Sequence, residues 1–324
     1  MTTREDYATI VAGVRELLGS NPDRVEARRG KAKAIVDGLA RWRATLADAE
    51  DRRPKRTRGV VLSITQGALL NAGDTIVASV EVNGRGVGKL EFHARAAAPT
   101  FTTLEKKRLV WSNTTRSREH RNDARLIREY LANASEQKRV PERTAQGQLL
   151  RSFFATPKHA LLRNLSPVAP AGFMMEIPAP VAASNALKDG TGNIDLLLRS
   201  GRGRYAGFVV CELKKPGATI DPYVVLRQAI RYAAALNVEV NGIEGVIKPA
   251  NSSLYRKLYG ATGDSKLRFG SMAAIDAKNE RNVSSAFEAL AVPARPEAWV
   301  EVLLYRDEAA APGRALIQVR RSTA

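Results

Sequence analysis

The chain has 324 residues, with 51 Lys and Arg against 33 Asp and Glu, so its formal net charge is +18. A hydrophobic fraction of 44% is close to the globular average and excludes wholesale disorder. One cysteine excludes a disulfide framework, and no apolar window approaches the ~18 residues of a membrane span. Without an apolar N-terminal stretch, we expect a soluble, cytoplasmic protein with no membrane partner, whose positive field attracts polyanions.

The first residues predict two helices. Ile10, Val14 and Leu17 recur at helical spacing, and Gly19 marks the end of that segment. A second helix is expected over residues 23–49, where apolar residues again recur at helical spacing.

A small antiparallel sheet is expected after the short basic connection at 51–58. Alternating apolar residues predict three strands, at 60–64, 75–82 and 87–92. Asn83-Gly84 is typical of a tight hairpin turn and would join the last two strands.

Two helices flank a polar linker in the middle of the chain. Residues 105–132 predict an Arg-rich helix, and 141–154 predict a second helix that begins with proline. The linker between them suggests a boundary. We therefore expect an α+β region at 1–138, for regulation, substrate sensing or assembly, and a catalytic α/β domain at 139–324 with a central mixed sheet flanked by helices.

The most informative stretch predicts a β-hairpin around the glycine-bearing turn at 200–204. Asp195 interrupts an apolar run in the first strand, where a lone carboxylate is costly to bury. Glu212 and Lys214 share one face of the second strand, because side chains alternate along a strand. If the strands pair about the turn, Asp195 lies close to Glu212.

Two carboxylates and a lysine on neighbouring strands suit the hydrolysis of phosphodiester bonds. Carboxylate oxygens are preferred ligands of Mg²⁺, which polarises a phosphate and lowers the pKa of bound water. Lysine can position the attacking water or stabilise developing negative charge. The main-chain carbonyl of Leu213 is a further candidate ligand.

This pattern resembles the PD-(D/E)XK nuclease superfamily, whose mark is an Asp followed across a hairpin by Glu-X-Lys. Asp195 matches the Asp, and Glu212-Leu213-Lys214 match Glu-X-Lys, although no proline directly precedes Asp195. The resemblance implies a restriction-endonuclease-like core, with Mg²⁺ or Mn²⁺ bound by Asp195, Glu212 and Leu213, and Lys214 as a catalytic residue.

The next segment extends the resemblance. Gln228-Ala-Ile-Arg-Tyr232 lies in an expected amphipathic helix and is similar to the Gln-X-X-X-Tyr element of RecB-like branches and of Shedu-type antiphage nucleases. Gln228 and Tyr232 share one helix face, and the resemblance implies a place near the metal or the DNA backbone. Glu142 is the candidate for the glutamate that the family often carries before the hairpin, and Glu176 is its rival.

Basic residues around the hairpin and the helix could contact phosphates or form only a solvated rim. They are Arg202, Arg204, Lys215, Arg227 and Arg231. Strand alternation sets Lys215 opposite Lys214, so Lys215 is expected to contact DNA or solvent rather than to act in catalysis.

We therefore expect a Mg²⁺-dependent deoxyribonuclease, endonucleolytic and homo-oligomeric, with DNA favoured as its partner. The antiphage resemblance implies defence against foreign DNA. Two other interpretations stay open: a catalytically silent nucleic-acid-binding protein on the same scaffold, and an assembly scaffold that is basic only for solubility.

Overall fold

The structure, a computed structural model, describes residues 4–30, 33, 60–64, 75–82, 85–93, 98–111, 118–134, 164–168, 177–178, 181, 192–200, 207–215, 217–250, 267–293, 299–305 and 316–321. These residues fall into two compact units. The smaller unit contains residue 33 and the described residues from 60 to 134. The larger unit contains 4–30 together with the described residues from 177 onward and 164–168.

The smaller unit is a five-stranded antiparallel sheet with one long helix. Its elements are β1 (Val60–Ile64), β2 (Thr75–Val82), β3 (Arg85–His93), β4 (Thr100–Thr103), β5 (Arg108–Val110) and α4 (Arg118–Ala134), the strands pairing in chain order. Its core forms around Phe101, whose ring meets Trp111 edge-on at 5.6 Å and Tyr130 of α4 at 5.9 Å. The Tyr130 hydroxyl donates to the Val87 carbonyl at 2.9 Å, which fixes α4 on the sheet.

Predictions for this unit are confirmed for three strands and wrong for part of the helix. The strands at 60–64 and 75–82 have the expected bounds, and the third runs slightly further at both ends, over Arg85–His93. The expected turn at Asn83-Gly84 lies outside the described residues. The helix predicted over 105–132 begins only at Arg118, because Arg108–Val110 pairs with β4 as an edge strand and cross-strand contacts override local helical preference.

The larger unit is built on a six-stranded mixed sheet, which confirms the α/β class. Its strand order is β13-β12-β11-β10-β9-β6. The central strands β10, β11 and β12 are parallel, and the outer neighbours pair antiparallel. The strands are β6 (Leu165–Pro167), β9 (Leu196–Ser200), β10 (Gly207–Leu213), β11 (Arg268–Asp276), β12 (Val300–Tyr305) and β13 (Leu316–Arg321). A separate two-stranded ribbon joins β7 (Ile177–Pro178) to β8 (Asn193–Ile194).

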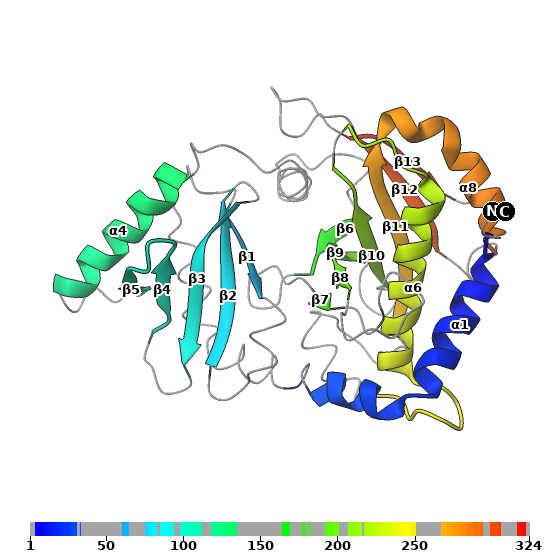
Figure 1. The fold of residues 1–324 in the computed structure, drawn as a ribbon, viewed down its shortest axis with the longest axis horizontal. Helices are drawn as coiled ribbons and strands as arrows, with labels where there is room; N and C mark the ends of the chain where they lie inside the picture. The colour runs from blue at the N-terminus through cyan, green and yellow to red at the C-terminus, as the bar shows by residue number, and fades with distance from the viewer. Residues whose placement is uncertain are drawn as a thin grey trace. The chain divides into compact units, whose positions relative to one another are not determined.

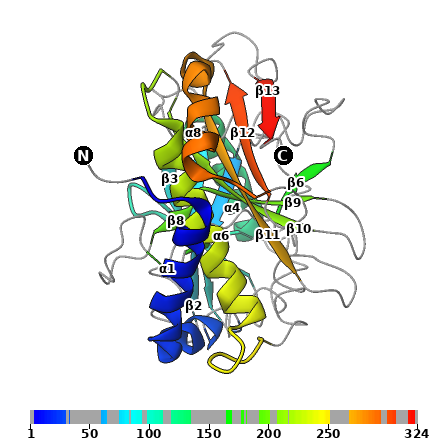
Figure 2. The ribbon, with the colours of Figure 1, turned by 90° about the vertical axis from the view of Figure 1, so that its right-hand side faces the viewer.

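Helix α6 (Pro222–Asn241) connects β10 to β11 and covers one face of the sheet (Figure 1). Asp221 caps its N-terminus by accepting the Tyr223 N–H at 3.0 Å, and Pro222 occupies its first turn. Helices α1 (Tyr7–Gly19) and α8 (Val283–Leu290) pack along α6 (Figure 2). No described helix is both long and apolar enough to cross a membrane.

The core of this unit is shared by the helices and the helix-facing side of the parallel strands. It contains Val225, Leu226 and Ile230 of α6, and Ala273, Ile275, Val302 and Leu304 of the sheet, together with Ile10 of α1. Burial of this apolar area is the main term that holds α6 in place over β10 and β11.

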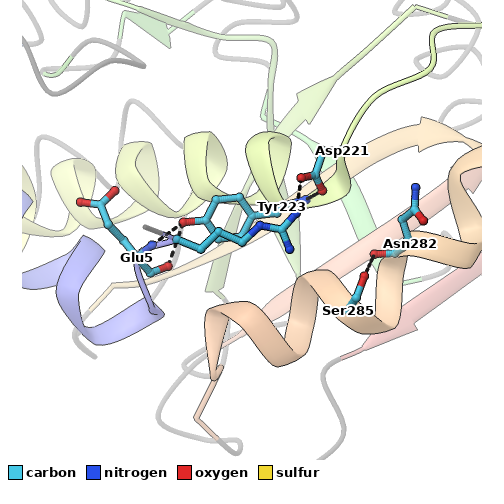
Figure 3. Close-up of polar contacts among 6 residues, drawn as sticks. Glu5, Asp221, Tyr223, Asn282 and Ser285 are labelled. Atoms are coloured by element: carbon cyan, nitrogen blue, oxygen red, sulfur yellow. Dashed lines mark hydrogen bonds and ion pairs between the residues drawn. The ribbon is translucent and has the colours of Figure 1, made fainter. Parts of the chain in front are cut away.

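The N-terminal segment is bound to the start of α6, which corrects the expected division at 138/139. The Tyr223 hydroxyl accepts the Glu5 N–H at 2.7 Å and donates to the Glu5 carbonyl at 3.0 Å (Figure 3). Arg4 pairs with Asp221 at 2.6 Å. Residues 22–30 continue as a helix, where Arg29 donates to the Glu239 carbonyl at 2.8 Å; the rest of the helix expected over 23–49 falls almost wholly outside the described residues. The first thirty residues therefore belong with the larger unit.

Candidate active site

Asp195 lies at a bend between β8 and β9, at the end of the hairpin that β9 forms with β10. The antiparallel register pairs Leu196 with Cys211, so its continuation by one residue sets Asp195 opposite Glu212. The Asp195 Oδ2 atom accepts the Leu213 N–H at 2.8 Å. This bond holds the carboxylate across the strand from Glu212, in the place that the hairpin predicts.

Glu212 is buried on the side of the sheet that α6 covers. Its parallel partner Ala273 belongs to the core shared with α6, and partners in a parallel pair point to the same side. The side chain is only 1% exposed, and Oε1 has no hydrogen-bond partner among the described residues. Burial, reinforced by the neighbouring Asp195 charge, raises the pKa of Glu212 well above its usual range.

Lys214 follows β10 directly and extends along the same side as Glu212. Its N–H donates to the Ala274 carbonyl at 3.0 Å, and its carbonyl accepts the Tyr305 hydroxyl. The ammonium lies 3.9 Å from Glu212 Oε2, and the side chain is 24% exposed. The cation is therefore held beside the buried carboxylate while one side of it reaches solvent.

Tyr232 of α6 lies near the two carboxylates, and Gln228 contacts Tyr232 from one helical turn away. The Gln228 amide donates to the Tyr232 hydroxyl at 3.2 Å, across one helical turn. Tyr232 is 1% exposed, and burial followed by the Glu212 charge raises the pKa of Tyr232 to about 12. The hydroxyl therefore stays protonated at neutral pH and lies within electrostatic reach of both Glu212 and Asp195.

Comparison of the chain with protein-family models, curated proteins and solved structures finds no match.

The site offers a small set of oxygen ligands for a cation. Among the described residues, no group of three His, Cys, Asp or Glu side chains could hold a metal ion. Two carboxylates, Asp195 and Glu212, do converge, and the Leu213 carbonyl belongs to the same strand end. Oxygen ligands in this number fit Mg²⁺, which keeps several waters when it binds protein. The buried Glu212 Oε1 is the atom for which a cation would supply the missing partner.

Gly192 is a residue of the site that the sequence did not single out. A Cβ atom built on Gly192 would come within 2.5 Å of the Tyr232 Cζ atom and closer still to the hydroxyl oxygen. Only glycine lets the chain enter β8 this close to Tyr232. A glycine near a predicted strand is too common a feature to reveal such a contact in advance.

Of the basic residues predicted to contact phosphates, two are engaged by the protein itself. Arg227 is bound by Glu5, whose Oε2 atom accepts from Arg227 Nε at 2.6 Å. Arg231 is buried, and burial lowers the pKa of its guanidinium. The Arg227 side chain is 23% exposed and Arg231 only 4%, so both are held mainly by the protein, and their contact with phosphates stays a prediction.

Of the other predicted site residues, the structure describes Lys215 alone. Lys215 is exposed beside Lys214, as strand alternation predicts, and its contact with DNA stays a prediction. Arg202, Arg204, Glu142 and the rival Glu176 lie outside the described residues.

Arg227→Ala is expected to lower the free energy of unfolding by about 1 kcal/mol, because a partly buried ion pair with Glu5 is lost. Affinity for DNA should change less than twofold. Urea unfolding and fluorescence anisotropy with a labelled duplex measure the two effects, with Glu5→Ala and the double variant completing the cycle. A loss of DNA affinity without a loss of stability would contradict the assignment of Arg227 to the Glu5 pair.

Proposed function

We propose that this chain is a metal-dependent nuclease of the PD-(D/E)XK class, which hydrolyses phosphodiester bonds, most readily in DNA. One observation carries the proposal: Asp195, Glu212 and Lys214 converge at one strand end, with a buried carboxylate oxygen that has no partner in the described protein. A buried carboxylate without full pairing is costly, so its presence favours a functional role over a structural one.

The arrangement of elements supports the same class. A β-hairpin carries the acidic residues, a helix crosses from its second strand, and the next strand returns parallel to it. The order is compatible with the central mixed sheet flanked by helices that the sequence predicts for the catalytic domain. The net charge of +18 adds a field that attracts nucleic acid.

Asp195, Glu212 and the Leu213 carbonyl would hold Mg²⁺ or Mn²⁺, which supplies Lewis-acid polarisation of the phosphate and water of lowered pKa. The protein's own groups do the rest. Lys214 places a positive charge where the phosphate develops negative charge, and its flexible stem lets it orient the attacking water.

Gln228 and Tyr232 complete one wall of the site. Their side chains bond to each other, and the buried Tyr232 lies within electrostatic reach of both carboxylates. The protonated Tyr232 hydroxyl presents a fixed dipole beside both carboxylates. We assign it to orienting the acidic groups rather than to proton transfer, because a pKa of about 12 is far from the near-neutral value that suits general acid–base catalysis.

Plasmid cleavage tests the proposal. Purified protein should nick or linearise plasmid DNA with Mg²⁺ or Mn²⁺, and EDTA should abolish the reaction. Lys214→Ala should slow cleavage by roughly 10²- to 10³-fold, because one group that stabilises transition-state charge is removed. Lys215→Ala is the matched control, since the neighbouring exposed lysine lies outside the acidic cluster, and we expect less than a threefold effect on kcat.

The outcome also separates the alternative functions. Salt-dependent retention on DNA without cleavage of any DNA or RNA would favour the catalytically silent binding protein. No retention at low salt would favour the assembly scaffold. The Shedu-type resemblance extends our proposal to defence against foreign DNA, which phage plating on cells expressing the wild type or Lys214→Ala would test.

A further inference from the structure

The loop that follows Lys214 is held by side chains from a different part of the chain. It leaves β10 after Leu213, passes through Gly217 in the left-handed region at φ 74°, and reaches the cap of α6 at Asp221. The described loop residues form neither helix nor strand. A backbone of this kind keeps one position only if its N–H and C=O groups find fixed partners.

Those partners come from the end of β11 and the 3-10 helix η5 (Ala277–Asn282) that follows it. Asp276 Oδ2 accepts the Gly217 N–H at 2.7 Å. Asn279 Oδ1 accepts the Ile220 N–H at 3.2 Å, and its amide donates to the Ala218 carbonyl at 3.0 Å. Lys278 donates its ammonium to the Gly217 carbonyl. Three side chains thus satisfy four main-chain groups of the loop.

Asn279 shows that these bonds require a specific side chain. The residue is 2% exposed, and a buried amide is costly unless its donors and acceptor are bonded. The Asn279 Oδ1 atom accepts one hydrogen bond from the loop, and the Asn279 amide donates another to it. The amide also donates to the Asp276 carbonyl at 3.2 Å. An apolar residue would fill the same buried place without binding the loop, so the amide serves the position of the loop.

We propose that Asn279 and Asp276 are positioning residues, which hold the loop from Lys214 to Ile220 so that the Lys214 ammonium stays beside Glu212. The inference rests on the proposed nuclease function for its catalytic consequence. The bonded main-chain groups belong to Gly217, Ala218 and Ile220, which follow Lys214 in the chain, whereas Asp195 and Glu212 precede it. Their loss should therefore disturb Lys214 while Asp195 and Glu212 keep their places.

The first test measures the lysine itself and needs no activity. Asn279→Ala is compared with the wild type and with Asn282→Ala, a matched control in the same 3-10 helix (Figure 3). Asn282 is exposed and forms no side-chain capping bond. The rate at which an amine-reactive reagent labels Lys214, relative to exposed Lys215, should rise severalfold in Asn279→Ala only. Amide exchange at Gly217 and Ile220 should rise in parallel. Unchanged labelling would overturn the proposal.

The second test measures catalysis. Asn279→Ala should lower kcat for plasmid cleavage roughly 10- to 100-fold, as expected when a catalytic group is misplaced by about 1 Å. KM and the Mn²⁺ concentration for half-maximal rate should stay within twofold. A merely structural defect would instead lower the active fraction and spare the labelling ratio. A kcat within twofold of wild type despite faster labelling would also overturn the positioning role.

One outcome separates this inference from the proposed function. If the wild type cleaves no nucleic acid but Asn279→Ala exposes Lys214, the nuclease proposal fails and the loop contact stands. If Asn279→Ala does not fold, Asp276→Asn is measured instead. This substitution removes one of the two hydrogen bonds that the Asp276 carboxylate accepts, and the side chain is partly exposed. It should change labelling in the same direction by a smaller factor, and no change would overturn the proposal.

Discussion

Glu212→Gln is expected to stop cleavage and to stabilise the metal-free protein. Cleavage should fall by roughly 10²- to 10³-fold, because the loss of a metal-binding carboxylate removes several kcal/mol of charge stabilisation at the phosphate. The free energy of unfolding without divalent ions should rise by about 1–3 kcal/mol, because a buried charge with one unpartnered oxygen is replaced by a neutral amide. The amide can also donate to the Asp195 carboxylate, which the native carboxylate repels.

The raised pKa of Glu212 also predicts how the stability difference between the wild type and Glu212→Gln changes with pH. The pKa of Glu212 is raised above 4.5 by folding, so the folded protein holds the Glu212 proton more tightly than the unfolded chain does. The contribution of Glu212 to stability is complete below pH 4.5 and is lost as the pH rises through the raised pKa. Chemical denaturation of both proteins in EDTA should therefore show a difference that is small at acidic pH and grows toward neutral pH.

Glu239→Gln is the matched control for Glu212→Gln. Glu239 is also buried in the larger unit, but its carboxylate accepts from Arg28 at 2.9 Å. Its replacement should lower stability by about 1–3 kcal/mol, because a charged partner is left without its counterion. The same substitution would thus have opposite effects at two buried glutamates. Equal destabilisation at both positions would show that Glu212 is a structural residue.

Gly192→Ala is expected to damage both fold and site. The added methyl group overlaps the Tyr232 hydroxyl, so either the strand that leads to Asp195 or the Tyr232 ring must move. Overpacking of this kind costs about 1–3 kcal/mol, and a displaced Asp195 should lower cleavage by roughly 100-fold. Thermal unfolding and plasmid cleavage measure the two effects.

Gly13→Ala provides the control for Gly192→Ala. Gly13 lies within α1, and a Cβ atom there meets no other atom within 4 Å. Alanine should stabilise that helix by about 0.5–1 kcal/mol and leave cleavage unchanged. Equal and small effects at the two glycines would contradict the close approach between Gly192 and Tyr232.

The acidic pair could be predicted from the sequence because its geometry is local. Strand alternation sets Glu212 and Lys214 on one face, and the turn between the strands brings Asp195 opposite Glu212. The same reasoning located α6 and the shared face of Gln228 and Tyr232. Where local preference competed with sheet pairing, as at Arg108–Val110, it failed because a cross-strand partner outweighs helical propensity.

The amino-acid sequence by itself determined the secondary-structure order around the site, the charge of the molecule and the spacing of its acidic and basic groups. Only the tertiary structure decided which of those groups bind other groups of the protein. Glu5 meets Arg227 across 222 residues, and Asn279 meets Ile220 across 59, and no periodic pattern records either pair. Such contacts depend on how α1 and β11 pack around α6, and that packing is set by the burial of apolar side chains from the whole unit.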